Sequence, residues 1–149
     1  MTLLIDADWL IYSSCCACEQ DIQWDTNLHT LHADERDVNE MVDGRVSYYQ
    51  AIAEDDKDVV MCFTEYPTFR HTIYPEYKAN RKNKRKPLGL RKIVEQVRER
   101  YESKSFDGLE GDDVMSLLAT SKQYDNPIIV SVDKDMRSVP CTLLAGDDM

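Results

Sequence analysis

The sequence predicts an α/β fold, a parallel sheet with helices on both faces. Short continuous apolar runs alternate along the 149 residues with segments of helical spacing. Parallel strands that are buried on both faces form such continuous runs, and each pair of them needs a crossover, usually helical. Three of the runs, Leu3–Ile5, Val59–Phe63 and Ile128–Val132, are followed within two residues by an acid. These features predict one domain in which acids collect at one edge of the sheet.

Apolar residues at helical spacing predict the helices between these strands. Asp8 is expected to cap the first helix, because a carboxylate at that position accepts free backbone N–H groups. The expected helices contain Trp9–Tyr12, Val38–Glu54, Leu90–Tyr101 and Leu109–Ser121. A last apolar run, Thr142–Ala145, predicts one more strand.

The remaining segments lack a clear period. Glu19–Glu35 is polar and irregular, and it is predicted to be a loop or an insertion of open role. Asp55–Lys57 is expected to be a turn, and Tyr66–Pro75, with two prolines, a loop or an edge.

The composition predicts a globular protein, with 42% hydrophobic and 31% charged residues. The sequence shows no signal peptide and no long apolar run, so a cytoplasmic protein without a membrane anchor is expected. An odd number of cysteines predicts free thiols in a reducing compartment. They are Cys15, Cys16, Cys18, Cys62 and Cys141. A zinc site formed by the first three with His29 and His32 is disfavoured, because the spacing matches no common zinc pattern.

Charge is distributed unevenly along the chain. The net charge is −10, yet Lys78–Lys104 holds eleven Lys and Arg against three Glu, a local net charge of +8 that leaves −18 elsewhere. A basic segment beside an acidic site suits a metal-dependent enzyme that acts on a polyanion, since the cations attract phosphate and metal ions neutralise the acids. The alternative is a solvated basic helix.

Seven acids stand where a metal-dependent nuclease needs them. In parallel α/β sheets, ligands bind beyond the carboxyl ends of the strands, and clustered carboxylates suit hard divalent cations. The candidate ligands are Asp6, Glu65, Glu110, Asp112, Asp113, Asp133 and Asp135. For the acids that open the helix near residue 110, the structural alternative is interaction with the helix dipole.

This set of acids predicts two Mg²⁺ or Mn²⁺ ions, about 4 Å apart, that activate water and stabilise the leaving oxygen of a phosphodiester. The sequence offers no convincing protein nucleophile, because Ser13 and Ser14 have no plausible histidine nearby in the sequence. The three histidines are not spaced for a catalytic triad or a zinc protease motif.

The segment Tyr77–Lys86 combines one aromatic residue with six cations. Lys78 and Arg81 would share a helical face and could hold the scissile phosphate, and Tyr77 could stack on an unpaired base. The candidate nucleic-acid-binding residues are Arg70, Tyr77, Lys78, Arg81, Lys82, Lys84, Arg85 and Lys86. The alternatives are a packing role for Tyr77 and a generic polybasic or nuclear-localisation segment.

Five stretches together resemble a known family. They are LLIDADWL, VVMCFTE, YPEYKANRKNKRKPLG, LEGDDVMSLLA and IIVSVDKDMRSVP, in that order along the chain. The chain resembles the 5′-nuclease (flap endonuclease) superfamily in its phage 5′–3′ exonuclease branch.

The resemblance implies a PIN-like (resolvase-like) fold, two divalent metals, and hydrolysis at 5′ ends or flaps of DNA; it leaves open an RNA–DNA hybrid as substrate. In a phage, such an enzyme would remove primers and break down host DNA. The family's metal ligands map onto Asp6, Glu110, Asp112, Asp113, Asp133 and Asp135. Its catalytic Lys and Arg map onto Lys78 and Arg81, and its helical gateway for a single-stranded 5′ end maps onto residues of about 74–101.

The chain departs from the family pattern in two respects. Glu65 stands where the family usually has Asp. The family also continues beyond the matched region with another Asp-bearing segment and a helix–three-turn–helix module that grips the duplex. Residues 1–149 are therefore expected to be the N-terminal catalytic half, with the rest absent; whether a second chain supplies it is left open by the sequence. The alternatives are a non-catalytic nucleic-acid-binding remnant or partner subunit, and a single-domain PIN-type ribonuclease, which would lack the YKANRK segment.

Overall fold

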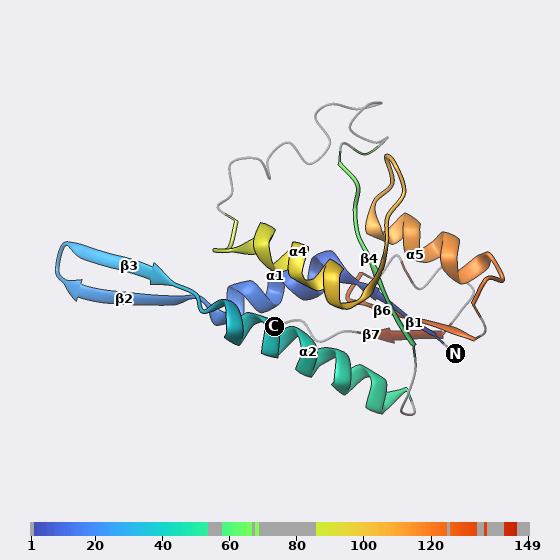
Figure 1. The fold of residues 1–149 in the computed structure, drawn as a ribbon, viewed down its shortest axis with the longest axis horizontal. Helices are drawn as coiled ribbons and strands as arrows, with labels where there is room; N and C mark the ends of the chain where they lie inside the picture. The colour runs from blue at the N-terminus through green and yellow to red at the C-terminus, as the bar shows by residue number, and fades with distance from the viewer. Residues whose placement is uncertain are drawn as a thin grey trace.

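A computed structural model describes residues 2–53, 58–66, 68, 86–124, 126–133, 136 and 142–145. Within them, a five-stranded parallel sheet has the order β5-β4-β1-β6-β7 (Figure 1). The strands are β1 (Thr2–Asp6), β4 (Asp58–Cys62), β5 (Glu102–Lys104), β6 (Pro127–Ser131) and β7 (Thr142–Ala145). The predicted α/β fold with a parallel sheet is confirmed.

Strand β1 is central and pairs with β4 on one side and β6 on the other. Ile5 is opposite Met61 in β4 and Val130 in β6, so the three strands end almost level with one another. Because all three run in the same direction, their carboxyl ends share one edge of the sheet. This register is what brings distant acids of the sequence together.

Helices cover both faces of the sheet. Three of them, α1 (Ala7–Cys18), α2 (Glu35–Ile52) and α4 (Leu90–Arg100), pack with Leu3 and Ile5 in one apolar core. The fourth described helix, α5 (Gly111–Thr120), packs with Leu4 on the opposite face. Successive side chains of a strand point to opposite faces, so one apolar run serves two cores. None of the described helices has the length and apolar content needed to cross a membrane.

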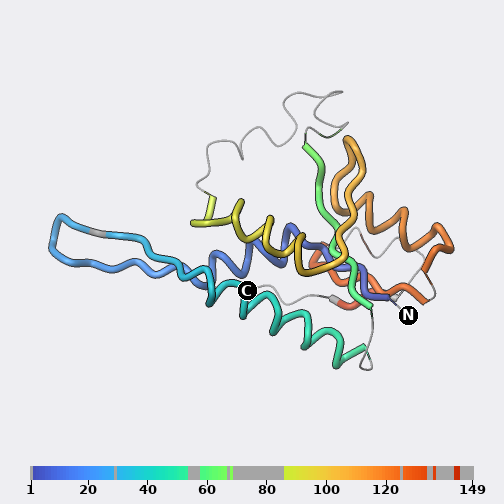
Figure 2. The backbone as a smooth tube through the Cα atoms, viewed as in Figure 1, coloured from blue at the N-terminus to red at the C-terminus, as the bar shows by residue number. Residues whose placement is uncertain are grey.

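A two-stranded antiparallel hairpin projects from one end of the domain (Figures 1 and 2). It consists of β2 (Gln20–Asp25) and β3 (Leu28–His32), in the segment where the sequence predicted an irregular loop. Polar residues occupy both strands and Trp24 is 63% exposed, so the hairpin has no single apolar face for a sequence pattern to reveal.

Two further details differ from the sequence prediction. The cap of α1 is Asp6, whose side chain accepts from the backbone N–H of Trp9, whereas the predicted cap, Asp8, lies in the first turn. Helix α2 begins at Glu35, earlier than its apolar stripe suggested, because the side chain of Asp34 caps it. The expected turn at 55–57 and most of the expected loop at 66–75 lie outside the described residues.

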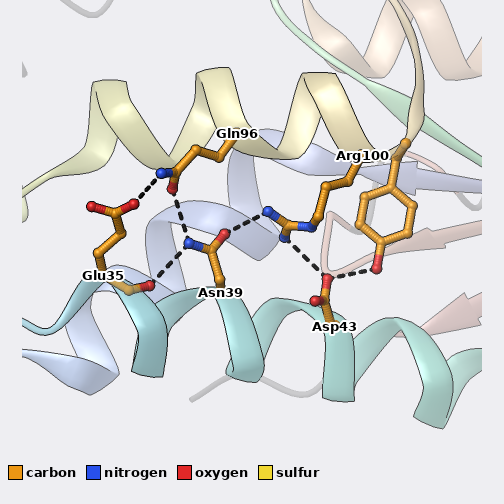
Figure 3. Close-up of polar contacts among 6 residues, drawn as sticks. Glu35, Asn39, Asp43, Gln96 and Arg100 are labelled. Carbon is orange, nitrogen blue, oxygen red and sulfur yellow. Dashed lines mark hydrogen bonds and ion pairs between the residues drawn. The ribbon is translucent and has the colours of Figure 1, made fainter.

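A row of polar contacts joins α4 to the first half of α2 (Figure 3). Asn39 donates to the Gln96 side chain over 2.9 Å, and Arg100 donates to Asn39 over 2.7 Å and to Asp43 over 3.0 Å. We call this row the α2–α4 clasp. Its members are Glu35, Asn39, Asp43, Lys92, Gln96, Arg100 and Tyr101. On its inner side, α4 buries Ile93 and Val97, so polar and apolar contacts together fix the helix.

Candidate metal and nucleic-acid site

Asp6 lies at the carboxyl end of the central strand and forms contacts in two directions. Its Oδ1 accepts a hydrogen bond from the backbone N of Trp9 at 3.3 Å, which anchors the start of α1. Its Oδ2 accepts from the Ser131 hydroxyl at 3.4 Å. The same hydroxyl accepts from the backbone N of Asp133 at 3.1 Å. Ser131, which sequence reasoning did not single out, therefore links Asp6 to the segment that carries Asp133.

The acids at the start of α5 divide into two kinds. Glu110 and Asp113 form a capping box, in which each side chain accepts from the other's backbone N–H. The bond from the backbone N of Glu110 to Asp113 Oδ2 is 3.3 Å long. Two predicted metal ligands thus have a structural role at the helix start.

Asp112 belongs instead to an acidic group with Asp6 and Asp133. Burial raises the pKa of Asp112 well above its usual range, and a hydrogen bond with Asp133 and the charge of Asp6 raise it further. Burial also raises the pKa of Asp6 to about 6, with the charges of Asp8 and Asp133 acting in the same direction. We call Asp6, Asp112 and Asp133 the acid cluster. They come from β1, α5 and the end of β6, and repulsion among them opposes full ionisation.

Asp8 is a site residue that sequence reasoning took for a helix cap. Its Oδ2 accepts from the backbone N of Thr64 at 2.9 Å, and the Thr64 hydroxyl accepts from the backbone N of Gly111 at 2.9 Å. A Cβ added at Gly111 would lie 3.3 Å from Asp8 Oδ2, so this glycine allows the close approach of α5. Asp8 and Thr64 together therefore join the start of α1 and the end of β4 to the start of α5. The signal in the sequence was a second acid two residues after Asp6.

Of the other predicted site residues, Glu65 and Lys86 are described by the structure but are not members of the acid cluster, and the rest lie outside the described residues. Glu65 is partly buried, and its backbone N donates to the carbonyl of Leu109 at 3.0 Å. Lys86 is exposed. Asp135 lies outside the described residues, and so do seven of the predicted nucleic-acid-binding residues, Arg70, Tyr77, Lys78, Arg81, Lys82, Lys84 and Arg85.

The described acids fit a divalent cation in their chemistry. They offer oxygen ligands and concentrated negative charge, the combination that Mg²⁺ and Mn²⁺ prefer. In the part of the chain that the structure describes, no three His, Cys, Asp or Glu side chains already have an arrangement that could hold a metal ion. The acid cluster thus has the right donors and the right charge, and the described residues alone do not preform the coordination shell.

The fold and the site together define an α/β domain with carboxylates gathered beyond the ends of its parallel strands, as in metal-dependent nucleases. Residues 1–142 match the family model described as the N-terminal resolvase-like domain of 5′–3′ exonucleases, and the chain belongs to this family.

Two curated phage proteins are similar to the chain along most of its length. The exodeoxyribonuclease of Enterobacteria phage T3 is 30% identical over 146 residues, covering 93% of this chain and 48% of the relative. The exonuclease of Escherichia phage T7 is also 30% identical over 146 residues, covering 93% of this chain and 49% of the relative. The chain spans about half the length of these relatives.

Among solved structures, the fold is similar to that of the phage T5 D15 protein. The structure of that protein with metal ions has a TM-score of 0.63 at 13% identity and covers 97% of this chain and 53% of the other. A complex of the same T5 flap endonuclease with DNA and metal ions has a TM-score of 0.60 at 13% identity, covering 97% and 54%. These likenesses support the assignment of the fold.

Proposed function

We propose that this chain is the catalytic domain of a divalent-metal-dependent 5′ nuclease that hydrolyses phosphodiester bonds at 5′ ends or flaps of DNA. The observation that carries the proposal is the acid cluster, in which Asp6, Asp112 and Asp133 converge from three separate elements, so that burial and neighbouring acids raise the pKa of Asp6 and of Asp112. A fold tolerates such repulsion at a site that a cation fills, and perturbed acids in one place are typical of functional sites.

In this proposal the acid cluster holds the ions. Glu110, Asp113 and Asp135 are further ligands, and so is Glu65, which follows β4. Two Mg²⁺ or Mn²⁺ ions would supply a water activated for attack and would stabilise the leaving oxygen. Asp6 is held by Ser131 and by the first turn of α1, so its carboxylate is oriented before a ligand arrives. Asp8 and Thr64 fix the start of α5 and hence the position of Asp112.

The segment Tyr77–Lys86 would supply the substrate contacts. Lys78 and Arg81 would bind the scissile phosphate and its developing charge, and the cations up to Lys86 would follow the backbone of the strand. Support comes from the six cations of Tyr77–Lys86 and from the phage relatives, whose names describe exonucleases. We place the activity in the cytoplasm of an infected bacterium, with a further segment or a second chain gripping the duplex.

A cleavage assay with a matched pair of variants tests this proposal. The chain is incubated with 5′-labelled flap, nicked and blunt duplex DNA, in Mn²⁺ and in EDTA. Short labelled products are expected in Mn²⁺ alone. Asp112→Asn removes one carboxylate from the acid cluster and should lower the rate at least a hundredfold, as when a preorganised catalytic group is lost.

The control is Asp107→Asn, which makes the same charge change at an exposed acid upstream of α5 and should leave cleavage unchanged. Cleavage that persists at the full rate in Asp112→Asn would refute the metal site. DNA binding without any metal-dependent cleavage would favour a nucleic-acid-binding subunit over an enzyme.

A further inference from the structure

Helix α4 carries a cation on the side opposite the α2–α4 clasp. Gln96 and Arg100, four residues apart, share the face that contacts α2. Arg98 lies midway between them, and two residues along an α-helix correspond to a rotation of about 200°. Its side chain therefore points away from α2, and it is exposed.

Arg98 lies over an aromatic ring at the edge of the candidate site. Its Cζ is 4.2 Å from the centroid of the Phe63 ring. Phe63 directly follows β4 and precedes Thr64, which contacts both Asp8 and Gly111. Arg98 is thereby placed beside the residues that join α1, β4 and α5 near the acid cluster.

A cation–π contact with Phe63 does not occupy the hydrogen-bonding groups of Arg98. A guanidinium that stacks through its flat face keeps its N–H donors in the plane of the group, directed outward, and these donors suit bidentate binding of a phosphate. Among the described residues, Arg98 forms no ion pair. Its positive charge does act on the buried Asp8 carboxylate, whose pKa it lowers against the stronger effect of burial.

We propose that Arg98 is a phosphate-binding residue, held by Phe63 at the edge of the acid cluster, which contacts one phosphodiester of a bound nucleic acid strand. This inference deepens the proposed function and rests on it. It adds a binding contact from α4 to those expected from Tyr77–Lys86. The clasp supports the role, because it fixes α4 from the opposite side and so sets the distance between Arg98 and the sheet edge.

Binding without cleavage tests the contact separately from catalysis. Fluorescence anisotropy of a 5′-labelled single-stranded oligonucleotide in EDTA compares the parent chain with three variants. Arg98→Met keeps an unbranched side chain against Phe63 and removes the charge, Arg98→Lys keeps a point charge, and Arg91→Met is the control. Arg91 is exposed on the same helix, seven residues and so about 10 Å away along the helix axis.

Arg98→Met is expected to raise the dissociation constant about tenfold, which is the usual scale for losing a hydrogen bond to a charged group. It should also reduce the slope of log K against log salt by about one, as for one lost phosphate contact. Arg98→Lys should recover part of the affinity, and Arg91→Met should stay within twofold of the parent. Thermal unfolding of each variant separates a binding effect from a loss of fold.

A series of oligonucleotides, each with one neutral methylphosphonate linkage, identifies the phosphate. One position in the series should weaken binding to the parent chain and have no effect on Arg98→Met. Equal affinities of Arg98→Met and Arg91→Met would overturn the proposal. So would a parent chain and an Arg98→Met variant that respond equally to every methylphosphonate position, because a residue that only balances the charge of Asp8 would behave in that way. If the chain binds DNA but does not cleave it, the nuclease function is refuted, and the binding data still decide whether Arg98 contacts a phosphate. A parent chain that binds no oligonucleotide would refute both.

Discussion

The α2–α4 clasp and the acid cluster both contain carboxylates, and the protein treats them in opposite ways. In the clasp, the Glu35 carboxylate pairs with the Lys92 ammonium at 2.7 Å and accepts a hydrogen bond from the Gln96 amide, and these partners lower its pKa. In the acid cluster, burial and neighbouring acids raise the pKa of Asp6 and Asp112. The two groups of carboxylates differ in their partners and also in their burial, because the clasp lies at the surface between two helices.

The contrast indicates which carboxylates serve the fold and which serve a ligand. Acids that meet donors hold elements together, whereas acids that face acids oppose folding until a cation arrives. Asp112 should therefore be dispensable for stability, and a carboxylate of the clasp should be dispensable for metal binding.

The largest expected effect comes from Asp112→Asn. In EDTA this variant should unfold at a higher temperature than the parent, because one of three mutually repelling acids has been neutralised. Saturating Mn²⁺ should stabilise the parent by about 2.7 kcal/mol when the ion is present at a hundred times its dissociation constant, and should stabilise the variant far less. Calorimetric unfolding with and without the ion measures both effects.

Asp107→Asn serves again as the matched charge change and should follow the parent under both conditions. A variant that lost stability in EDTA would show that Asp112 supports the fold, and the contrast between the two regions would then fail at its most important residue.

A smaller effect is expected from Asp43→Ala in the clasp. Asp43 accepts from Arg100 at 3.0 Å in an exposed bond and from the Tyr101 hydroxyl at 2.7 Å in a partly buried one. Their loss should cost about 1 kcal/mol of unfolding free energy, after allowance for solvent screening, and should not change the response to Mn²⁺. Urea unfolding gives the energy. The comparison variant is Glu40→Ala, which breaks an exposed pair with Arg36 and should cost only a few tenths of a kcal/mol.

The smallest effect concerns the titration of Glu35. Lys92 first, and then Gln96, lower the pKa of this carboxyl group. Its contribution to stability is therefore present above the ordinary pKa of a glutamate and is lost as the pH falls through the lower value in the folded state. In Lys92→Met, NMR titration of the Glu35 side chain should give a midpoint shifted upward toward the ordinary value. An unchanged midpoint would mean that Lys92 is not the partner that sets it.

Much of the fold could be predicted because its strands are buried on both faces. Continuous apolar runs such as Leu3–Ile5 indicate such strands whatever lies around them. The hairpin could not be predicted in the same way, because Gln20–Asp25 is solvated and carries no face that burial would make apolar. Strand β5 was also missed, because Glu102–Lys104 is short and polar and is defined by backbone pairing with β4.

The acid cluster was predictable because ligand sites of parallel sheets lie beyond the carboxyl ends of the strands, and Asp6 and Asp133 stand at two such ends. The sequence could not divide the neighbouring acids by role. Glu110 and Asp113 cap a helix, and Asp112, between them, faces the cluster. Asp8 would look the same in the sequence as a helix cap or as a tertiary contact. Its role became visible only when Thr64, 56 positions later, was placed beside it.

The central position of β1 has a consequence for how the chain folds. Both strands that flank β1 come much later in the sequence, at Asp58–Cys62 and Pro127–Ser131, so both edges of this apolar strand stay unpaired while the intervening residues are made. Synthesis at roughly 5–20 residues per second makes that interval several seconds or more. Parallel pairings between such distant segments also form slowly. We therefore expect β1 to be the segment most exposed to aggregation during synthesis, and chaperone binding to nascent chains to concentrate there.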